Sequence, residues 1–325
     1  MSDPKRDVVG IGNAIVDILV EVDDRFLEEQ ELAKGTMALI DSGQALELYR
    51  KLNDYVEQSG GSAANTMAGI ASLGGSAGFI GRVRDDELGA SFTRDIQKAG
   101  VEYTTEPAKV GPSTGRCIVL VTPDGERTMQ TYLGACAALS MEDLDEAMIA
   151  TSSITYLEGY LWDPPEAKEA FLAAAAMAHG AGRKVSLSLS DPFCVERHRG
   201  EFQDLVENHV DILLGNESEI LSLYETENLG AALDRVGSSC ELTAVTLGAE
   251  GAAVVTEQAV RRIPALPVKN VVDTTGAGDL FAAGFLYATT HGATPVEAAR
   301  TGGICAAVVI SQFGARPKER LSDLI

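Results

Sequence analysis

Short β-branched runs alternate with helical stretches through the second half of the chain. Strands are predicted at 153–157, 184–189, 210–214 and 244–247, and an alanine-rich helix at 165–179 lies between the first two. Parallel neighbours in a sheet need a long crossover connection, usually a helix, so this alternation is typical of a parallel sheet with helices on both faces. We therefore expect an α/β protein with three layers and a mostly parallel central sheet.

A second group of β-rich runs begins near the N-terminus, and no helix is predicted to separate its members. These members are 15–22, 35–40, 114–121 and 127–133. The last two flank an Asp124-Gly125 turn, which indicates a β-hairpin. We expect the four runs to form a small separate sheet. In this division, the small domain comprises 15–42 and 111–134, and the large domain comprises 1–14, 43–110 and 135–325.

A glycine turn lies between a β-branched run at 268–272, predicted as a strand, and a helix with an apolar face. The turn contains Gly276, Ala277 and Gly278, and the apolar face that follows contains Phe281, Gly284, Phe285 and Ala288. The first amides of a helix have no partner within the helix, and the helix dipole adds positive potential there. Glycine lets the backbone approach a ligand closely. The turn therefore predicts an anion site at the start of the helix.

Asp279 lies in the first turn of that helix and has two interpretations. An acidic residue there stabilises the helix dipole without any chemical role. Side chains in a helix also lean toward its N-terminus, so the carboxylate can face the anion site. A base beside an anion site is what phosphoryl transfer to an alcohol requires.

The run Asp273-Thr274-Thr275-Gly276-Ala277-Gly278-Asp279 resembles the C-terminal signature of the ribokinase-like (PfkB) sugar and nucleoside kinases. The resemblance implies that the Gly276, Ala277 and Gly278 amides form an anion hole and that Asp279 is the catalytic base. It implies use of ATP and Mg²⁺, and a β-sheet lid over the substrate. It leaves open a monovalent cation near Asp273 and Thr275. No phosphate-binding Gly-x-x-x-x-Gly-Lys-Ser/Thr motif occurs in the sequence.

Two N-terminal motifs extend the resemblance. Asn13 and Asp17 follow the first predicted strand, where they are either a turn residue and a solvated charge or the family's sugar-binding pair. A carboxylate can accept from two neighbouring ribose hydroxyls at once. The second motif opens a helix and contains Gly61, Ser62 and Asn65, which the resemblance assigns to substrate binding. A dinucleotide-binding fingerprint is excluded here because its third glycine is replaced by Ile15.

Two further motifs follow predicted strands and are expected to contact the nucleotide. Asn216 with Glu219 is either a helix capping box or, by resemblance, the group that holds Mg²⁺ through water. Thr246, Gly248 and Gly251 are either a hairpin turn or, by resemblance, nucleotide contacts. Both alternatives stay open from the residues alone.

The formal net charge of −22 argues against nucleic acid or an anionic membrane as a partner. The five cysteines are odd in number and scattered, and no apolar run is long enough to cross a bilayer. The cysteine pattern favours reduced thiols and a cytoplasmic location. The family resemblance implies an enzyme with a small-molecule substrate, either a nucleoside or a sugar. Whether the chain is a monomer or a homodimer through the lid is left open.

Within the family, the segment around Asn13 and the small residue Ser62 resemble adenosine kinases more than ribokinases. The resemblance implies phosphorylation of the 5′-hydroxyl of a ribonucleoside, most simply adenosine. Alternatives are a sugar kinase of the same family, or a binding module without catalysis. Apolar walls for a purine are expected from Ile15, Met37, Leu39, Cys117, Val119 and Leu133, with Trp162 as a further wall. Arg116 is either a surface cation or a contact to the transferring phosphate.

Overall fold

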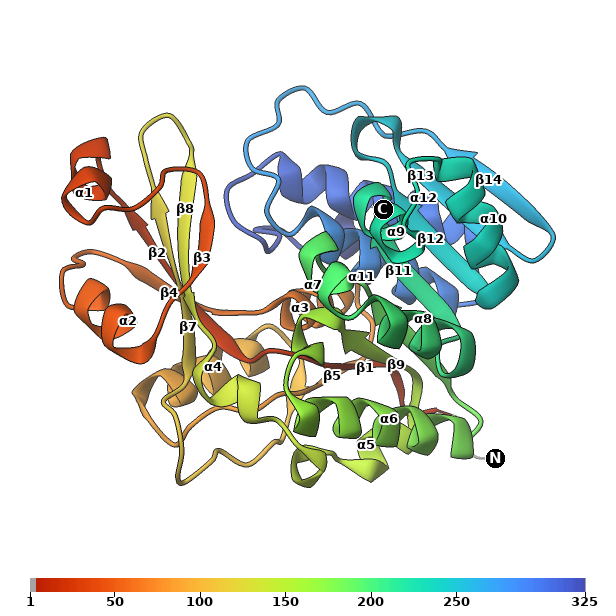
Figure 1. The fold of residues 1–325 in the computed structure, drawn as a ribbon, viewed down its shortest axis with the longest axis horizontal. Coiled ribbons are helices and arrows are strands. Elements are labelled where there is room, and N and C mark those ends of the chain that lie inside the picture. Colours follow the sequence, from red (N-terminus) through yellow and green to blue (C-terminus); the bar gives the residue numbers. More distant parts are fainter. Residues whose placement is uncertain (1–3, 325) are drawn as a thin grey trace.

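The computed structural model describes residues 4–324, whose strands form two separate sheets (Figure 1). Nine strands form the larger sheet, in the order β14-β13-β12-β11-β10-β9-β1-β5-β6. Their bounds are β1 Arg6–Ile11, β5 Ala77–Ile80, β6 Glu102–Tyr103, β9 Ser152–Glu158, β10 Lys184–Ser188, β11 Ile212–Asn216, β12 Leu242–Thr246, β13 Ala252–Thr256 and β14 Ala259–Ile263. Strands from β12 to β6 are parallel, and only β13 and β14 pair antiparallel. The predicted α/β fold with a mostly parallel sheet is confirmed.

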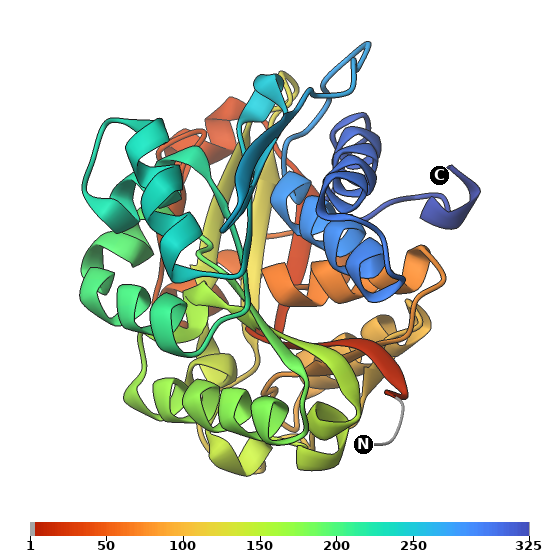
Figure 2. The ribbon, with the colours of Figure 1, turned by 90° about the vertical axis from the view of Figure 1, so that its right-hand side faces the viewer.

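Helices cover both faces of the large sheet, which makes the three expected layers (Figure 2). One layer contains α3 Ser62–Ser72, α4 Glu87–Lys98, α11 Ala277–Thr290 and α12 Pro295–Ile310. The other contains α5 Glu146–Ala150, α6 Pro165–Gly180, α7 Pro192–Arg197, α8 Arg199–Asn208, α9 Glu217–Tyr224 and α10 Leu229–Ser239. Successive strand residues such as Tyr156 and Leu157 enter opposite cores, because side chains alternate across a strand.

The small sheet has five strands, in the order β3-β8-β7-β2-β4. Their bounds are β2 Ile15–Glu21, β3 Met37–Leu39, β4 Val56–Gly60, β7 Gly115–Val121 and β8 Arg127–Tyr132. Two expectations are corrected here. β4 lies in the segment 43–110 assigned to the large domain, and α1 (Asp24–Glu29) separates β2 from β3. The polar run of β4 has no strand pattern of its own, and its antiparallel pairing with β2 makes it a strand.

The face of the small sheet that is turned away from the large domain is covered by α1 and α2 (Ser42–Tyr49) (Figure 1). Leu27 and Leu48 from these helices share a core with alternate residues of β2, among them Ile18. Arg116 lies on this covered face, with its guanidinium 5.6 Å from the ring centre of Tyr49 and 6.0 Å from that of Tyr132. Arg116 therefore points away from the substrate side, and a contact to the transferring phosphate is not supported.

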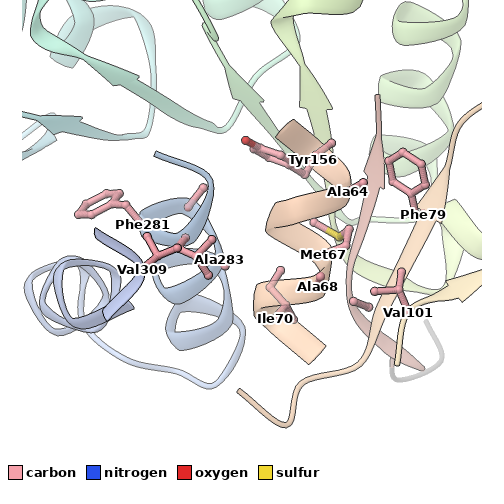
Figure 3. Packing of buried hydrophobic residues seen from close by; sticks show 14 of the residues in the cluster. Ala64, Met67, Ala68, Ile70, Phe79, Val101, Tyr156, Phe281, Ala283 and Val309 are labelled. Atoms are coloured by element: carbon pink, nitrogen blue, oxygen red, sulfur yellow. The ribbon is translucent and has the colours of Figure 1, made fainter. Parts of the chain in front are cut away.

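Helices α3 and α11 pack directly against each other beside the large sheet (Figure 3). A Cβ atom added at Gly69 of α3 would lie 2.7 Å from the Cβ of Ala283 in α11. The glycine therefore permits close helix contact, which fixes the first turn of one helix relative to the first turn of the other.

The predicted strand at 268–272 is wrong, because this run has no secondary structure. Val271 and Val272 are 60% and 52% exposed, so their β-branched side chains have no sheet neighbour to pack against. The amide of Val272 donates instead to the carbonyl of Ile310, the last residue of α12. The signature loop is thus tied to the end of α12. Within residues 4–324, no helix has both the length and the apolar composition that crossing a membrane requires.

Candidate active site

The motif residues gather at one edge of the large sheet because the strands that precede them are parallel. Asn13 follows β1, Glu158 ends β9, Asn216 ends β11 and Thr246 ends β12. All four positions are therefore at the carboxyl edge, where open α/β sheets bind ligands. The starts of α3 and α11 reach the same edge, since Ser62 contacts Asp279.

Asp279 is held by two side chains from the first turns of α3. The Ser62 hydroxyl donates to Asp279 Oδ1 over 2.6 Å, and the Asn65 amide donates from Nδ2 to Oδ2 over 3.1 Å. Both residues were expected to contact substrate, and here both orient the predicted base. Their substrate role stays a prediction.

Burial raises the pKa of Asp279 to about 6, and the hydrogen bonds from Ser62 and Asn65, together with the charge of Arg316, counteract part of that rise. A carboxylate with this pKa is mostly ionised at neutral pH and is a stronger base than an ordinary aspartate. This combination suits a general base, whose pKa should lie near the working pH.

The glycines of the signature loop have different structural roles. Gly276 precedes α11 with a φ of +76°, and a Cβ atom there would lie 2.7 Å from the carbonyl oxygen of Ala315. Apart from its chain neighbours and the backbone of its own helix, no heavy atom of the described residues lies within 4 Å of a Cβ position at Gly278. Gly276 is therefore required for the turn itself, whereas Gly278 leaves space for a ligand. The Ala277 amide donates to the carbonyl of Thr274, 3.2 Å away.

Asp17 lies on the face of β2 that also carries Ile15 and Leu19. Its carboxylate is so close to Gly60 that a Cβ atom there would lie 2.4 Å from it. Burial raises the pKa of Asp17 to about 7, against the effects of Arg316 and Arg127, which lower it. The structure thus brings Asp17 into the electrostatic field of Asp279, which also raises the pKa of Asp17.

Glu158 is a site residue that the sequence interpretation missed. Its side chain is 1% exposed and accepts from Asn13 Nδ2 over 2.6 Å and from the Ala63 amide over 2.8 Å. Burial raises its pKa to about 7. A carboxylate at the end of a predicted parallel strand was the available signal. Asn13 Oδ1 is buried and has no hydrogen-bond partner among residues 4–324.

Arg127, from β8 of the small sheet, reaches the signature loop and was also missed. It forms an ion pair with Asp273 and donates from Nη1 to the hydroxyl of Thr275 over 3.1 Å. Its guanidinium lies 4.4 Å from the ring centre of Phe313. The expected place for a monovalent cation, near Asp273 and Thr275, thus already contains a positive charge.

The expected apolar wall residues share one face of the small sheet with Asp17. Register pairs Asp17 with Cys117, Leu19 with Val119, Val119 with Met129 and Met37 with Met129, and paired residues point to the same side. Leu39 follows at the next position on that face of β3, and Leu133 directly follows β8. Trp162 as a further wall is wrong. It is buried against Phe171 and Phe202, with both ring centres 5.9 Å away, and donates to Glu201.

Asn216 and Glu219 form the capping box that was weighed against a magnesium role. Asn216 Oδ1 accepts from the Glu219 amide over 2.9 Å, and both Glu219 oxygens accept from Asn216. Burial and, to a smaller extent, the nearby Asp191 raise the pKa of Glu219 to about 7. In residues 4–324, no three acidic, His or Cys side chains form a metal cluster. The role of Asn216 and Glu219 in holding Mg²⁺ through water stays a prediction.

β12 and β13 form the hairpin that was the structural alternative for the segment containing Thr246. Gly248, with a φ of +58°, has open space around its Cβ position, so a ligand can approach its backbone. At Gly251 a Cβ atom would lie 2.1 Å from the carbonyl of Ile263. Close packing against Ile263 therefore explains why residue 251 is a glycine, without any ligand. Gly248 is the stronger candidate for a nucleotide contact.

Matches to known proteins cover the same segments. The chain matches the pfkB family of carbohydrate kinases over residues 37–320. It belongs to that family. This pfkB family chain is 50% identical to the adenosine kinase of Sinorhizobium meliloti, with a TM-score of 0.91 and 98% of each chain covered. It is 47% identical to a probable sugar kinase of Rhizobium etli, with a TM-score of 0.91 over 99% of this chain and 98% of the other. Adenosine kinase 1 of Arabidopsis thaliana is 27% identical, with 98% of both chains covered.

The expected family and the expected kinase activity are therefore confirmed. The pfkB family chain is a phosphotransferase that uses ATP and has an alcohol group as acceptor. The roles of its individual site residues stay predictions.

Proposed function

We propose that the protein transfers the γ-phosphoryl group of ATP to the 5′-hydroxyl of adenosine. The observation that supports this most is the position of Asp279. Its carboxylate lies at the start of α11, beside the open backbone of Gly278, and shares an electrostatic site with Asp17. In this proposal Asp279 is the base, the amides at the start of α11 form the anion site, and Asp17 binds the ribose diol, all within one site. The adenosine kinase of Sinorhizobium meliloti, 50% identical over 98% of each chain, supports the choice of adenosine.

In this proposal Asp17 accepts hydrogen bonds from the two ribose hydroxyls, and the sugar lies against Gly61 and Asn13. The 5′-hydroxyl then reaches Asp279, which accepts its proton as the oxygen attacks the γ-phosphorus. The amides around Gly276 and Gly278 stabilise the charge on the transferred group. The small sheet, as a lid, excludes water from this reaction.

The nucleotide is proposed to lie along the carboxyl ends of β11 and β12, near Thr246 and Gly248. Mg²⁺ would be held near Glu219 and Asn216 through water, with Asp191 adding negative charge. When bound, the metal neutralises phosphate charge. The monovalent cation near Asp273 stays a prediction. We propose a cytoplasmic enzyme, in keeping with five cysteines that are all buried and unpaired.

The proposed subunit is a monomer. Helices α1 and α2 cover the face of the small sheet through which a second lid could pair (Figure 1). Sedimentation at micromolar concentration should give the mass of one chain, 34.2 kDa. A stable species of twice that mass would favour the dimer.

Steady-state kinetics with ATP, Mg²⁺ and a panel of acceptors tests the substrate. Adenosine should have a higher kcat/KM than ribose, fructose and their phosphates, because a free sugar leaves the apolar lid face unfilled. Asp279→Asn keeps the shape of the side chain and should lower kcat by at least ~10²-fold while adenosine affinity changes little.

A sugar kinase is the second candidate, supported by the probable sugar kinase of Rhizobium etli at 47% identity. A higher kcat/KM for any free sugar would establish it over adenosine. Nucleoside binding without turnover of any acceptor would favour the non-catalytic module.

A further inference from the structure

The segment Gly314-Ala315-Arg316 follows α12 and packs beneath the anion site. The Gly314 amide donates to Asp273 Oδ2 over 2.8 Å. A Cβ atom on Gly276 would lie 2.8 Å from the Cα of Ala315, so the two backbones are in close contact. The side chain of the third residue, Arg316, extends from this point toward the start of α3.

The Arg316 side chain is 8% exposed and bridges two helices of the large domain. Its Nε donates to Asn65 Oδ1 over 3.1 Å, and its Nη1 pairs with Asp95 Oδ2 over 3.2 Å. Asp95 also accepts from the backbone and the hydroxyl of Ser59, at the end of β4. Nη2 is buried and has no hydrogen-bond partner among residues 4–324.

We propose that Arg316 is a positioning residue for phosphoryl transfer, which orients the Asn65 amide toward Asp279 and places a positive charge beside Asp279 and Asp17. The inference rests on the proposed kinase function and adds a residue to its site.

The orientation of Asn65 follows from its two partners. Its oxygen accepts from Arg316, so its Nδ2 must face the other way, where it donates to Asp279. If the amide rotated by half a turn, two oxygens would face each other and Asp279 would lose a donor. An arginine, which only donates, holds this amide in the orientation that the base requires.

Arg316 differs in charge from the other groups around Asp279. Asp279 interacts electrostatically with Asp17 from β2, with Tyr156 and Glu158 from β9, and with Tyr160 from the turn after β9. These groups are neutral or negative, whereas Arg316 is positive and lowers the pKa of Asp279 and of Asp17. Without this charge, the pKa of Asp279 would be higher. Asp279 would then stay protonated up to a higher pH and could not act as a base in that range.

The test measures kcat/KM for ATP-dependent phosphorylation of adenosine between pH 5 and pH 9. Three forms of the protein are compared: the wild type, Arg316→Gln and Arg316→Lys. In Arg316→Gln, the acidic limb of the profile should move up by about one pH unit or more, the usual effect of losing one nearby opposite charge. The loss of activity should therefore be greatest at low pH and partly recover at high pH. Arg316→Lys keeps the charge, so its limb should stay near the wild-type position even if kcat falls.

Asp95→Asn is the matched control, because it removes the ion-pair partner of Arg316 but keeps the charge beside Asp279. Its acidic limb should not move upward. If Arg316→Gln and Asp95→Asn lose stability equally and neither limb moves, Arg316 is only a structural residue and the inference is wrong.

A second readout does not depend on turnover. The Asp279 carboxyl carbon, identified by NMR as the signal missing from Asp279→Asn, should titrate at higher pH in Arg316→Gln than in the wild type. An unchanged titration would overturn the inference. Absence of phosphorylation by the wild type with every acceptor would instead contradict the proposed function, and the two failures are thereby distinguished.

Discussion

Four acidic side chains of the candidate active site have raised pKa values, and burial is the main cause for each: Asp17, Glu158, Glu219 and Asp279. Each accepts hydrogen bonds, lies near an arginine or does both, and these interactions stabilise the ionised form. They offset only part of the effect of burial. Such groups bind their protons more tightly in the folded than in the unfolded protein. At these residues the site is organised for chemistry at some expense of stability.

The residue-scale prediction concerns Asp17→Asn. The folded pKa of Asp17 is about 7, well above the value of about 3.9 for an unfolded aspartate. Ionisation of Asp17 therefore lowers the free energy of unfolding as pH rises from about 4 to about 7. The asparagine of the variant does not ionise, so the substrate-free variant should unfold at a higher temperature than the wild type at pH 8, by about 2 °C or more.

The difference between the two proteins should shrink toward pH 4, where the folded wild type holds the proton on Asp17 and the unfolded chain begins to bind it as well. Affinity for adenosine should fall in the variant, and affinity for a 2′-deoxy analogue should fall less. Asp234→Asn, on an exposed turn of α10, is the control and should change neither property. The burial argument would be contradicted if the unfolding temperature of the variant minus that of wild type were lower at pH 8 than at pH 4.

At the scale of elements, two helices deliver their first turns to one point. The contact between Gly69 of α3 and Ala283 of α11 sets the separation of the helices, and Ser62 and Asn65 therefore reach Asp279. The short glycine loop before α11 does not control this placement alone. Its geometry depends on Ala315 and Gly314, which lie beyond the next helix.

Gly278→Ala tests whether the open space at the start of α11 belongs to a ligand. Nothing in the described residues outside its own helix and chain neighbours lies within 4 Å of the new Cβ, and alanine is favoured over glycine in a helix, so stability should not fall. If a phosphate approaches this backbone, the methyl group should reduce kcat/KM for ATP by about 10²-fold, the scale of losing one oxyanion contact.

Gly303→Ala is the matched control, since this α12 glycine has equally open surroundings. It should keep wild-type kinetics and similar stability. If Gly278→Ala keeps wild-type turnover, the phosphate does not bind beside Gly278.

For the whole molecule, the decisive contact joins the small sheet to loops of the large domain. Arg127 connects β8 of the small sheet to Asp273, Thr275 and Phe313 of the large domain. Because this contact ends on the signature loop, it couples the position of the lid to the anion site. We expect closure of the small sheet and assembly of that site to be one event.

Arg127→Met should leave the small sheet free to open, because the ion pair with Asp273 is lost. Without substrate, hydrogen exchange of the amides in 15–21, 115–121 and 127–132 should be faster in the variant than in wild type. Adding adenosine should slow this exchange less in the variant than in wild type. Turnover by the variant should also gain a dependence on potassium, since Asp273 then lacks its counter-charge. Arg25→Met, on the exposed side of α1, is the control for the same sheet. Equal exchange in all three proteins would show that Arg127 does not hold the lid.

Much of this protein follows from local patterns in the sequence. The alternation of strands and helices predicts the parallel sheet, and the turn at Gly276 predicts the start of α11 with Asp279 in its first turn. These features depend on residues a few positions apart, and their periodicity and backbone preferences are readable from the chain. Side-chain alternation also predicts that Ile15 and Leu19 lie on the same face of β2 as Asp17, because this pattern is local as well.

Only the tertiary structure decided the rest. Arg316 and Asn65 are 251 positions apart, Arg127 and Thr275 are 148 apart, and Glu158 and Asn13 are 145 apart. Nothing local distinguishes Arg316 and Arg127 from surface charges, and β4 is a strand only because β2 lies beside it. The opposite case is the run at 268–272, whose β-branched residues find no strand partner and stay irregular. Local preference is worth a fraction of a kcal/mol per residue, so burial, pairing and charge across the fold determine where such residues act.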